Sequence, residues 1–137
     1  MREGHIGREC GAAKRNMLVY PAERYDIILT INKLAEELGL IKLSGEADKE
    51  IESCYISDLL SRVLGGCQPG DVWITVQTSL NMVAVAVMTD VSCVIFPEGL
   101  TAQDNVLEKA TEEGLTVFSS DESAFSLAVK IAQLIAQ

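Results

Sequence analysis

The chain is poor in the residues that mark several large classes of protein. Its 137 residues include one histidine and only 5% aromatic side chains, and Cys10, Cys54, Cys67 and Cys93 are too widely spaced for a CxxC motif. No apolar run approaches the roughly 20 residues that a membrane-spanning helix requires. A secretory signal pattern is also missing. We therefore expect a cytoplasmic protein with reduced, mostly buried cysteines, no metal site and no membrane partner.

The motifs that usually bind phosphate or assist nucleophilic catalysis are missing as well. Neither GxxxxGK[ST] nor GxGxxG occurs, and the single His5 lies far from the loops considered below. The loop carboxylates Asp58, Glu98 and Asp121 are better explained by helix capping or solvation than by acid–base work. We predict a protein that is not an enzyme and has no cofactor. A small enzyme with Asp58 or Glu98 as its base is the weakest alternative.

Positive charge is scarce. The net charge is −9, and residues 29–137 carry six Lys or Arg against sixteen Asp or Glu. Because binding to a polynucleotide normally needs a basic face that releases counterions, nucleic acid is excluded as an expected partner. A small anionic ligand remains compatible with this charge, since loop amides and helix N-termini can bind an anion locally.

The first 28 residues differ from the rest of the chain. They lack apolar periodicity and hold five basic and four acidic side chains. We predict that residues 1–28 form a peripheral or disordered leader and that residues 29–137 form one α/β domain. One hypothesis is that the native reading frame begins later, at Met17 or Leu29, so that the leader is not native.

From residue 51 onward the chain alternates between apolar strand-like runs, polar loops and helix-like stretches. The strand-like runs are residues 51–56, 72–76, 92–96 and 116–118, with a further short run at 40–43. Strands that alternate with helices are typical of βαβ units. We therefore predict a three-layer α/β/α fold whose sheet is mainly parallel.

Local signals indicate where the helices begin. Thr30 and Gly39 bracket a helix, Ser57 is a candidate cap, Thr101 and Asp104 have capping-box spacing, and the last helix is expected to start near Ser120 or Asp121. Residues 82–88 are ambiguous because their valines favour a strand, whereas Thr78 or Ser79, together with Asn81, is typical of a helix start. We predict a helix there, because two βαβ units close only if this segment is helical.

The polar loops that follow the predicted strands define the candidate site. In a parallel sheet these loops meet at the carboxyl edge, where small ligands commonly bind. The candidate ligand-binding residues are Ser57, Asp58, Gln77, Thr78, Ser79, Asn81, Glu98, Gly99, Ser119 and Ser120. Taken one at a time, these residues are better explained as helix starts, so only their convergence favours binding.

Four segments together resemble a known family. They are TINKLAEELGLIKLSG, YISDLLSRVLGG, PGDVWITVQTSLNMVAVAVMTDVSCVIFPEGL and VFSSDESAF, which in this order span about residues 30–135. They are similar to stand-alone DRTGG-domain proteins, which are relatives of the regulatory domains of some phosphotransacetylases and CBS-containing pyrophosphatases. They also resemble the amino-terminal domain of HPr kinase/phosphorylase, although its P-loop kinase half is missing here.

The residues that give that family its name are altered in this chain. Thr78-Ser79-Leu80 stands where the family has its Asp-Arg pair, and Pro97-Glu98-Gly99 stands where it has Thr-Gly-Gly, so only Gly99 keeps the pattern. Loss of the arginine removes a fixed cation from any ligand site.

The resemblance implies a regulatory homodimer without phosphotransfer activity. Its expected partners are a small metabolite or nucleotide and a protein encoded by a neighbouring gene. The alternative is an interaction module without a ligand, whose function lies in the dimer surface or in the acidic helix around Glu108, Glu112 and Glu113.

Overall fold

The computed structural model describes residues 28–136, so the predicted leader lies almost wholly outside the described residues. A five-stranded sheet with the order β2-β7-β6-β5-β4 forms the centre of the domain. The strands β4 to β7 pair in parallel, and β2 pairs antiparallel with β7 at one edge. The strands are β2 (Ile41–Ser44), β4 (Ser53–Ile56), β5 (Asp71–Ile74), β6 (Cys93–Phe96) and β7 (Val117–Ser119).

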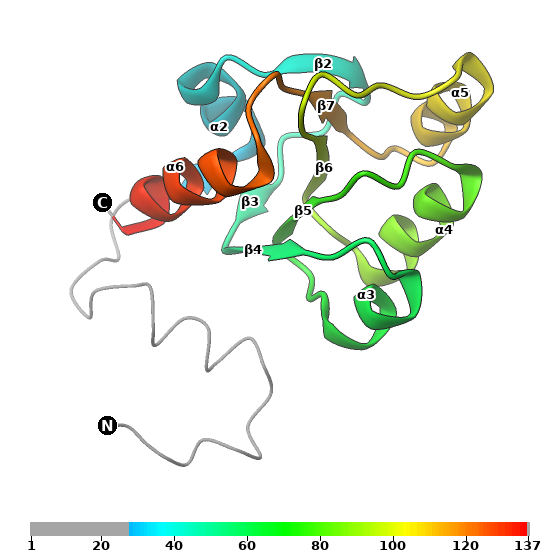
Figure 1. Ribbon diagram of the computed structural model, residues 1–137, viewed down its shortest axis with the longest axis horizontal. Coiled ribbons are helices and arrows are strands. Elements are labelled where there is room, and N and C mark those ends of the chain that lie inside the picture. The colour runs from blue at the N-terminus through cyan, green and yellow to red at the C-terminus, as the bar shows by residue number, and fades with distance from the viewer. Residues whose placement is uncertain (1–27, 137) are drawn as a thin grey trace.

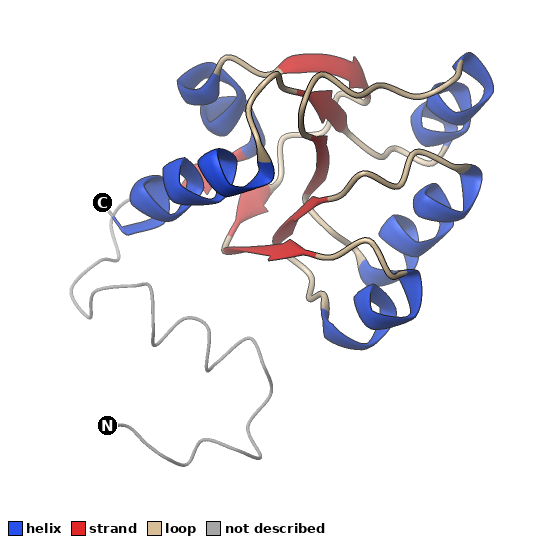
Figure 2. Ribbon diagram, in the orientation of Figure 1, coloured by secondary structure: helices blue, strands red, loops and turns tan. Residues whose placement is uncertain are grey.

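Helices cover both faces of this sheet, as Figures 1 and 2 show. One face carries α2 (Ile31–Leu38) and α6 (Ala124–Ala136). The other face carries α3 (Leu60–Gly66), α4 (Leu80–Thr89) and α5 (Asp104–Glu112). A small second sheet pairs β1 (Leu29–Thr30) with β3 (Glu50–Ile51). The prediction of a three-layer α/β/α fold with a mainly parallel sheet is confirmed.

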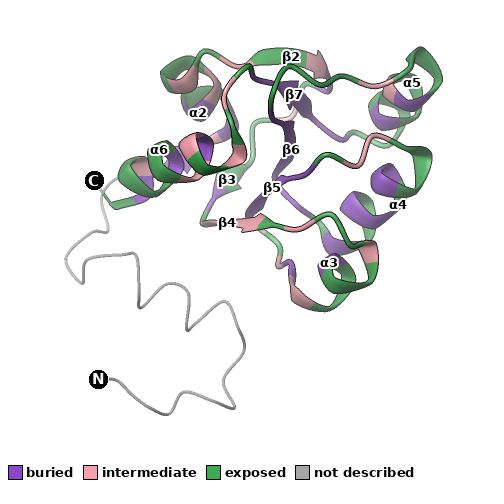
Figure 3. Cartoon of the chain, viewed as in Figure 1, coloured by how far each residue is buried: buried purple, intermediate pink, exposed green. Residues whose placement is uncertain are grey.

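The core is divided by the sheet into two apolar layers. Alternate residues of β5 enter opposite layers: Trp73 packs with α3, α4 and α5, whereas Val72 and Ile74 pack with α2 and α6. The central strands are buried throughout, and the outer helix surfaces are largely exposed (Figure 3). A parallel sheet covered on both faces is expected to have strands that are apolar on both sides.

Two helix predictions are confirmed in detail. The ambiguous segment 82–88 lies within α4, whose N-cap Ser79 accepts a hydrogen bond from the Met82 amide. Helix α2 is capped by Thr30 and ends at Gly39, which adopts the left-handed conformation with φ 63°. The valines of α4 are tolerated because the packing of a crossover helix against the sheet outweighs their small helix penalty.

Two predictions of helix starts were wrong. Helix α5 has Gln103, not Thr101, as its N-cap, and the Gln103 side chain makes no capping hydrogen bond. Helix α6 begins at Ala124, with Ser123 Oγ accepting from the Ser126 amide at 3.1 Å. The serines before it are used elsewhere, because the chain first forms a loop with the segment after β6.

Two further predictions need correction near β4. The expected strand 51–56 is interrupted at Glu52, since β3 pairs with β1 and β4 pairs with β5. Ser57 does not cap α3, whose N-cap is Leu59. Instead, Ser57 Oγ accepts a hydrogen bond from the Leu59 amide at 3.3 Å within the loop.

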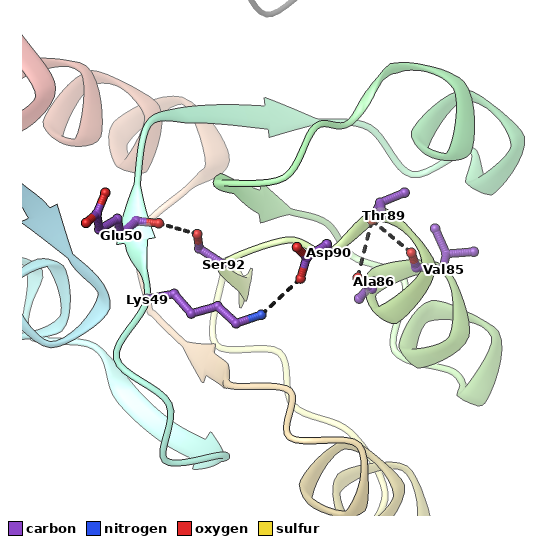
Figure 4. Close-up of polar contacts among 7 residues, drawn as sticks. All are labelled: Lys49, Glu50, Val85, Ala86, Thr89, Asp90 and Ser92. Carbon is purple, nitrogen blue, oxygen red and sulfur yellow. Dashed lines mark hydrogen bonds and ion pairs between the residues drawn. The ribbon is translucent and has the colours of Figure 1, made fainter.

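Polar contacts hold the edge of the sheet at which the parallel strands begin (Figure 4). Ser92 Oγ donates to the Glu50 carbonyl, and Lys49 Nζ lies 3.2 Å from Asp90 Oδ1. Thr89 Oγ1 donates to a carbonyl one turn earlier in α4 at 2.8 Å. The contacts of Ser92 and Lys49 attach the segment that carries β3 to the turn between α4 and β6, whereas that of Thr89 lies within α4.

The cysteines partly follow the expectation of buried thiols. Cys67 and Cys93 are buried, whereas Cys54 is only partly buried and Cys10 lies outside the described residues. Burial, with a smaller contribution from nearby Cys54, raises the pKa of the Cys93 thiol far above its ordinary value. Among residues 28–136 no group of His, Cys, Asp and Glu side chains is arranged to hold a metal ion. Across the same residues no helix has the length and apolar character needed to cross a bilayer.

Gly45 provides a test of the packing between β2 and β7. It has φ 87°, and a Cβ built there would lie 2.5 Å from Thr116 Cα and 2.6 Å from the Leu115 carbonyl oxygen. We expect Gly45→Ala to lower the free energy of unfolding by about 3 kcal/mol or more, since a left-handed penalty and a backbone clash combine.

Gly114→Ala is the matched control for this substitution. Gly114 also has a positive φ, 75°, but nothing lies within 4 Å of its built Cβ. Its cost should stay near 1 kcal/mol. Urea denaturation measures both values, and equal losses would contradict the role assigned to the Gly45 contact.

Candidate ligand-binding site at the carboxyl edge of the sheet

All ten predicted site residues lie in or beside the segments that leave the carboxyl ends of β4, β5, β6 and β7 (Figure 1). The parallel pairing of these strands brings the segments to one edge of the sheet. They do not form a single pocket there. In each of two groups, the residues form hydrogen bonds with other loop residues and so stabilise the edge. A third group lines an open groove.

The first group joins the loops after β4 and β5. Asp58 Oδ1 accepts hydrogen bonds from Thr75 Oγ1 and from the Val76 amide, both at 2.9 Å. Gln77 Nε2 donates to the Asp58 carbonyl at 2.8 Å. The Asp58 carboxylate therefore connects two loops that are distant in sequence, instead of capping a helix.

A buried tryptophan in the core fixes the position of the loop after β4. Trp73 is fully buried, and its Nε1 donates to the Ser57 carbonyl at 2.9 Å. A buried indole N–H needs such an acceptor, because an unpaired polar group in the core costs free energy. The position of the β4–α3 loop is thus set by the core.

The second group joins the segments after β6 and β7. The Gly99 amide donates to the Ser120 carbonyl at 2.7 Å, and Ser119 Oγ donates to the Leu100 carbonyl at 2.7 Å. Ser120 Oγ accepts from the Glu122 amide at 3.1 Å. Both serines are buried, and their hydroxyls stabilise the loop through these hydrogen bonds.

Glu98 belongs to this second group through its backbone. It has φ 62°, an uncommon conformation for a residue other than glycine, and its amide donates to the Glu122 carbonyl at 2.8 Å. Gly99 follows with φ 73°. Two successive left-handed residues form the sharp turn that lets this loop reach the segment after β7.

The third group lines a groove between the N-terminal ends of α4 and α5. Thr78, Ser79 and Asn81 form its α4 side, and the groove has a volume of about 620 Å³. The α5 side and the apolar part of the wall come from Leu80, Thr101, Ala102, Gln103, Asn105 and Val106. We refer to this pocket as the α4–α5 groove.

Sequence reasoning missed the α5 side of the groove. Thr101 was assigned to a capping box, and Gln103 and Asn105 were not considered. The loop after β6 was the signal that could have revealed these residues, because it follows a parallel strand and leads into a helix just as the loop after β5 does. Since both loops lead into helices on the same face of the sheet, the N-termini of those helices lie side by side.

The electrostatics of the groove come from helix ends, from neutral polar side chains and from Asp104, which lies in the first turn of α5 between the lining residues Gln103 and Asn105. No ionisable side chain is among the residues that line it. The N-terminal ends of α4 and α5 each provide backbone N–H groups, and the partial positive charge is unopposed at α4 but partly offset by Asp104 at α5. Such a site favours the anionic or polar part of a small ligand and has no acid–base group to act on it.

The described residues thus define a three-layer α/β/α domain with a polar groove at the carboxyl edge of its parallel sheet. No protein-family model matches the chain, and no curated protein matches its sequence.

Among solved structures, the chain is similar to the CBS and DRTGG domains of the regulatory region of Clostridium perfringens pyrophosphatase, complexed with the activator diadenosine tetraphosphate. The TM-score is 0.64 at 14% sequence identity, and the match covers 90% of this chain and 57% of the other. This chain therefore corresponds to just over half of that regulatory region. The likeness supports the DRTGG-like fold that the sequence resemblance implies.

Asp58→Ala tests the structural role of this carboxylate. The substitution removes the acceptor for both Thr75 Oγ1 and the Val76 amide. We expect the free energy of unfolding to fall by about 1–3 kcal/mol, because the bonds are charge-assisted and the Thr75 side chain is buried.

Glu108→Ala on the exposed side of α5 is the control for Asp58→Ala and should change stability by less than about 0.5 kcal/mol. Thermal and urea denaturation measure both. An Asp58→Ala protein as stable as the parent would show that these hydrogen bonds contribute nothing net.

Glu122 gives the domain a dependence on pH. A hydrogen-bonded contact with Lys130 at 2.9 Å, together with the Ser126 hydroxyl, lowers the pKa of the Glu122 carboxyl. A lowered pKa in the folded state adds stability at neutral pH that is lost as the pH falls through that pKa.

We therefore expect Glu122→Gln to lower the melting temperature at pH 7. This difference from the parent should shrink as the pH drops below about 4, the ordinary range of a glutamate. Scanning calorimetry from pH 7 to acid provides the measurement. A difference that stays constant with pH would exclude the ion pair as its source.

Proposed function

We propose that this protein is a non-catalytic regulatory domain that senses a small anionic metabolite or nucleotide in the α4–α5 groove and acts as a homodimer on a protein partner. The observation that carries the proposal is the groove itself, in which the N-terminal ends of two helices and neutral polar side chains border about 620 Å³. This volume falls within the roughly 300–1,000 Å³ of small-molecule sites.

An anionic ligand fits this groove better than a cationic one. The helix ends offer N–H donors and a partial positive charge, while no carboxylate lines the pocket to bind a cation. The apolar wall formed by Ala102 and Val106 suits a ring or an alkyl part of the same ligand. Thr78 and Ser79 replace the charged pair of the DRTGG pattern, so binding would depend on amides and hydroxyls without a fixed side-chain cation.

The absence of a catalytic arrangement in the groove supports a sensing role. Asp58, the loop carboxylate with the best-defined contacts, is occupied in joining two loops and does not line the groove. The structural neighbour is itself part of a regulatory region bound to a nucleotide activator. Nucleotides are therefore the first ligands to test.

An interaction module without a ligand is the second candidate. It is favoured by a second, apolar pocket on the outer surface of α4 and α5, which includes Val87 and Met88 and shares Leu80 with the groove. In that case the surface of these helices, and not the α4–α5 groove, would carry the function.

Thermal-shift measurements with nucleotides and phosphorylated metabolites distinguish the two candidates. A ligand present at about 100 times its Kd stabilises the folded state by about 2.7 kcal/mol and should raise the melting temperature by several degrees. A panel in which no compound raises the melting temperature would contradict ligand sensing and favour the interaction module.

Asn81→Asp locates the binding site of any active compound. Asn81 lies in the first turn of α4 and lines the groove, so the acidic side chain suits the helix end but repels an anion. We expect the thermal shift to fall at least several-fold. Gln133→Glu, on the exposed surface of α6 across the sheet, makes the same change of amide to carboxylate and should leave the shift intact. Equal shifts in both variants would exclude this groove.

A further inference from the structure

We infer that the outer face of α4 is the surface through which two copies of this chain associate, with the two α4 helices antiparallel across a two-fold axis at Ala84. This α4 face consists of Leu80, Ala84, Val87 and Met88. The inference rests on the homodimer part of the proposed function and is independent of the ligand.

The first observation is that α4 has no charged side chain on any side. Its sequence is LNMVAVAVMT, and the residues that face the sheet include Met82, Val83, Val85 and Ala86. The opposite side of the helix is apolar too, with exposed fractions of 48% at Leu80, 41% at Val87 and 71% at Met88. A helix on the surface of a monomer normally has polar residues on its outer side.

The second observation is a pocket in the same surface. It has a volume of about 370 Å³ and lies between α4 and α5, with the α4 face, Val83, Lys109 and Glu113 around it. Lys109 lies 3.1 Å from Glu113 and 3.9 Å from Glu112, so it offsets part of the acidic charge at the border of the pocket. Met88 stands at one end of this apolar surface as its most exposed side chain.

Charge makes a second copy the best-fitting occupant of this surface. Residues 29–137 carry ten more acidic than basic side chains, so contacts between copies through most faces would bring like charges together. The α4 face reduces that repulsion because it has no charge of its own and Lys109 beside it offsets part of the charge of Glu112 and Glu113.

The spacing of the side chains suits a two-fold contact. Leu80 and Met88 lie four residues before and after Ala84 on one stripe of the helix. When two such helices run antiparallel and cross at Ala84, Met88 of each copy meets Leu80 of the other. The small alanine at the crossing lets the helices approach closely, and the contact is self-complementary as a two-fold interface requires.

The available area agrees with this arrangement. The exposed fractions of Leu80, Val87 and Met88, with Ala84 between them, correspond to on the order of 300 Å² of apolar surface in each copy. A stable interface buries about 800 Å² on each partner, with an apolar core inside a polar rim. The α4 face has the size of such a core, and α3 and α5 on either side supply the rim.

Sedimentation velocity of the full chain over a concentration series tests the inference. We expect a dimer. We expect Met88→Glu or Leu80→Lys alone to raise the dissociation constant of this dimer at least tenfold. Phe125→Glu is the control, because Phe125 is 79% exposed on α6 at the other face of the sheet and should not affect association. Circular dichroism checks that each variant keeps the helical content and melting temperature of a folded domain.

A double variant tests the antiparallel arrangement itself. Met88→Glu combined with Leu80→Lys should restore the dimer, since each new glutamate would face a new lysine of the other copy. Within one helix the two positions are two turns apart and cannot pair, so recovery requires the second copy.

Each contrary outcome overturns a defined part of the inference. A wild-type chain that stays monomeric at about 100 µM would overturn the homodimer, whether or not a ligand shifts its melting temperature. A dimer that Met88→Glu leaves unchanged would exclude the α4 face. Failure of the double variant to associate would exclude the antiparallel crossing at Ala84.

Discussion

The parallel pairing of β4, β5, β6 and β7 is the constraint on which the rest of the structure depends. Parallel neighbours need crossover connections, and here the crossovers α3, α4 and α5 all cover one face of the sheet, while α2 and α6, which precede and follow the parallel strands, cover the other. The strands are consequently buried on both sides, which explains why residues such as Trp73 and Ile74 are apolar in succession along the chain. The same pairing carries every loop that leaves a parallel strand to one edge, so the candidate site and the core have a common origin.

Some loop residues at that edge form hydrogen bonds with a neighbouring loop, and others line the α4–α5 groove. Asp58 joins the loops after β4 and β5, and Ser119 and Ser120 help to join the segments after β6 and β7. Between these two stabilised pairs lies the α4–α5 groove, bordered by helix ends. A rigid border with neutral polar groups is suited to recognition of a small ligand, because the donors are held in place before it arrives. Helix α4 links this groove to the apolar surface proposed for self-association, since Leu80 lines both pockets.

The outcome at particular residues shows which sequence signals were reliable. The helix start expected at Thr78 or Ser79 is confirmed, with Ser79 as the cap, because the capping signal and the crossover requirement agree on a helix over residues 82–88. Thr101 was misread, because a threonine three residues before an aspartate satisfies the capping pattern without forming the cap. Of the ten predicted site residues, Thr78, Ser79 and Asn81 line the groove, whereas Ser57, Asp58, Gln77, Glu98, Gly99, Ser119 and Ser120 are not among the residues that line it. Side chains such as Asp58 have partners distant in sequence, which a local pattern does not reveal.

By itself the sequence determined the alternation of strands and helices, the two-sided burial of the central strands and the polar character of the loops, because these features follow from local periodicity and composition. The three-dimensional arrangement alone decided which polar groups bind one another and which remain available. Hydrogen bonds such as that between Thr75 and Asp58, 17 residues apart, depend on strand order. The neighbouring positions of the α4 and α5 N-termini likewise arise from adjacent crossovers on one face of the sheet, and only folding brings them together.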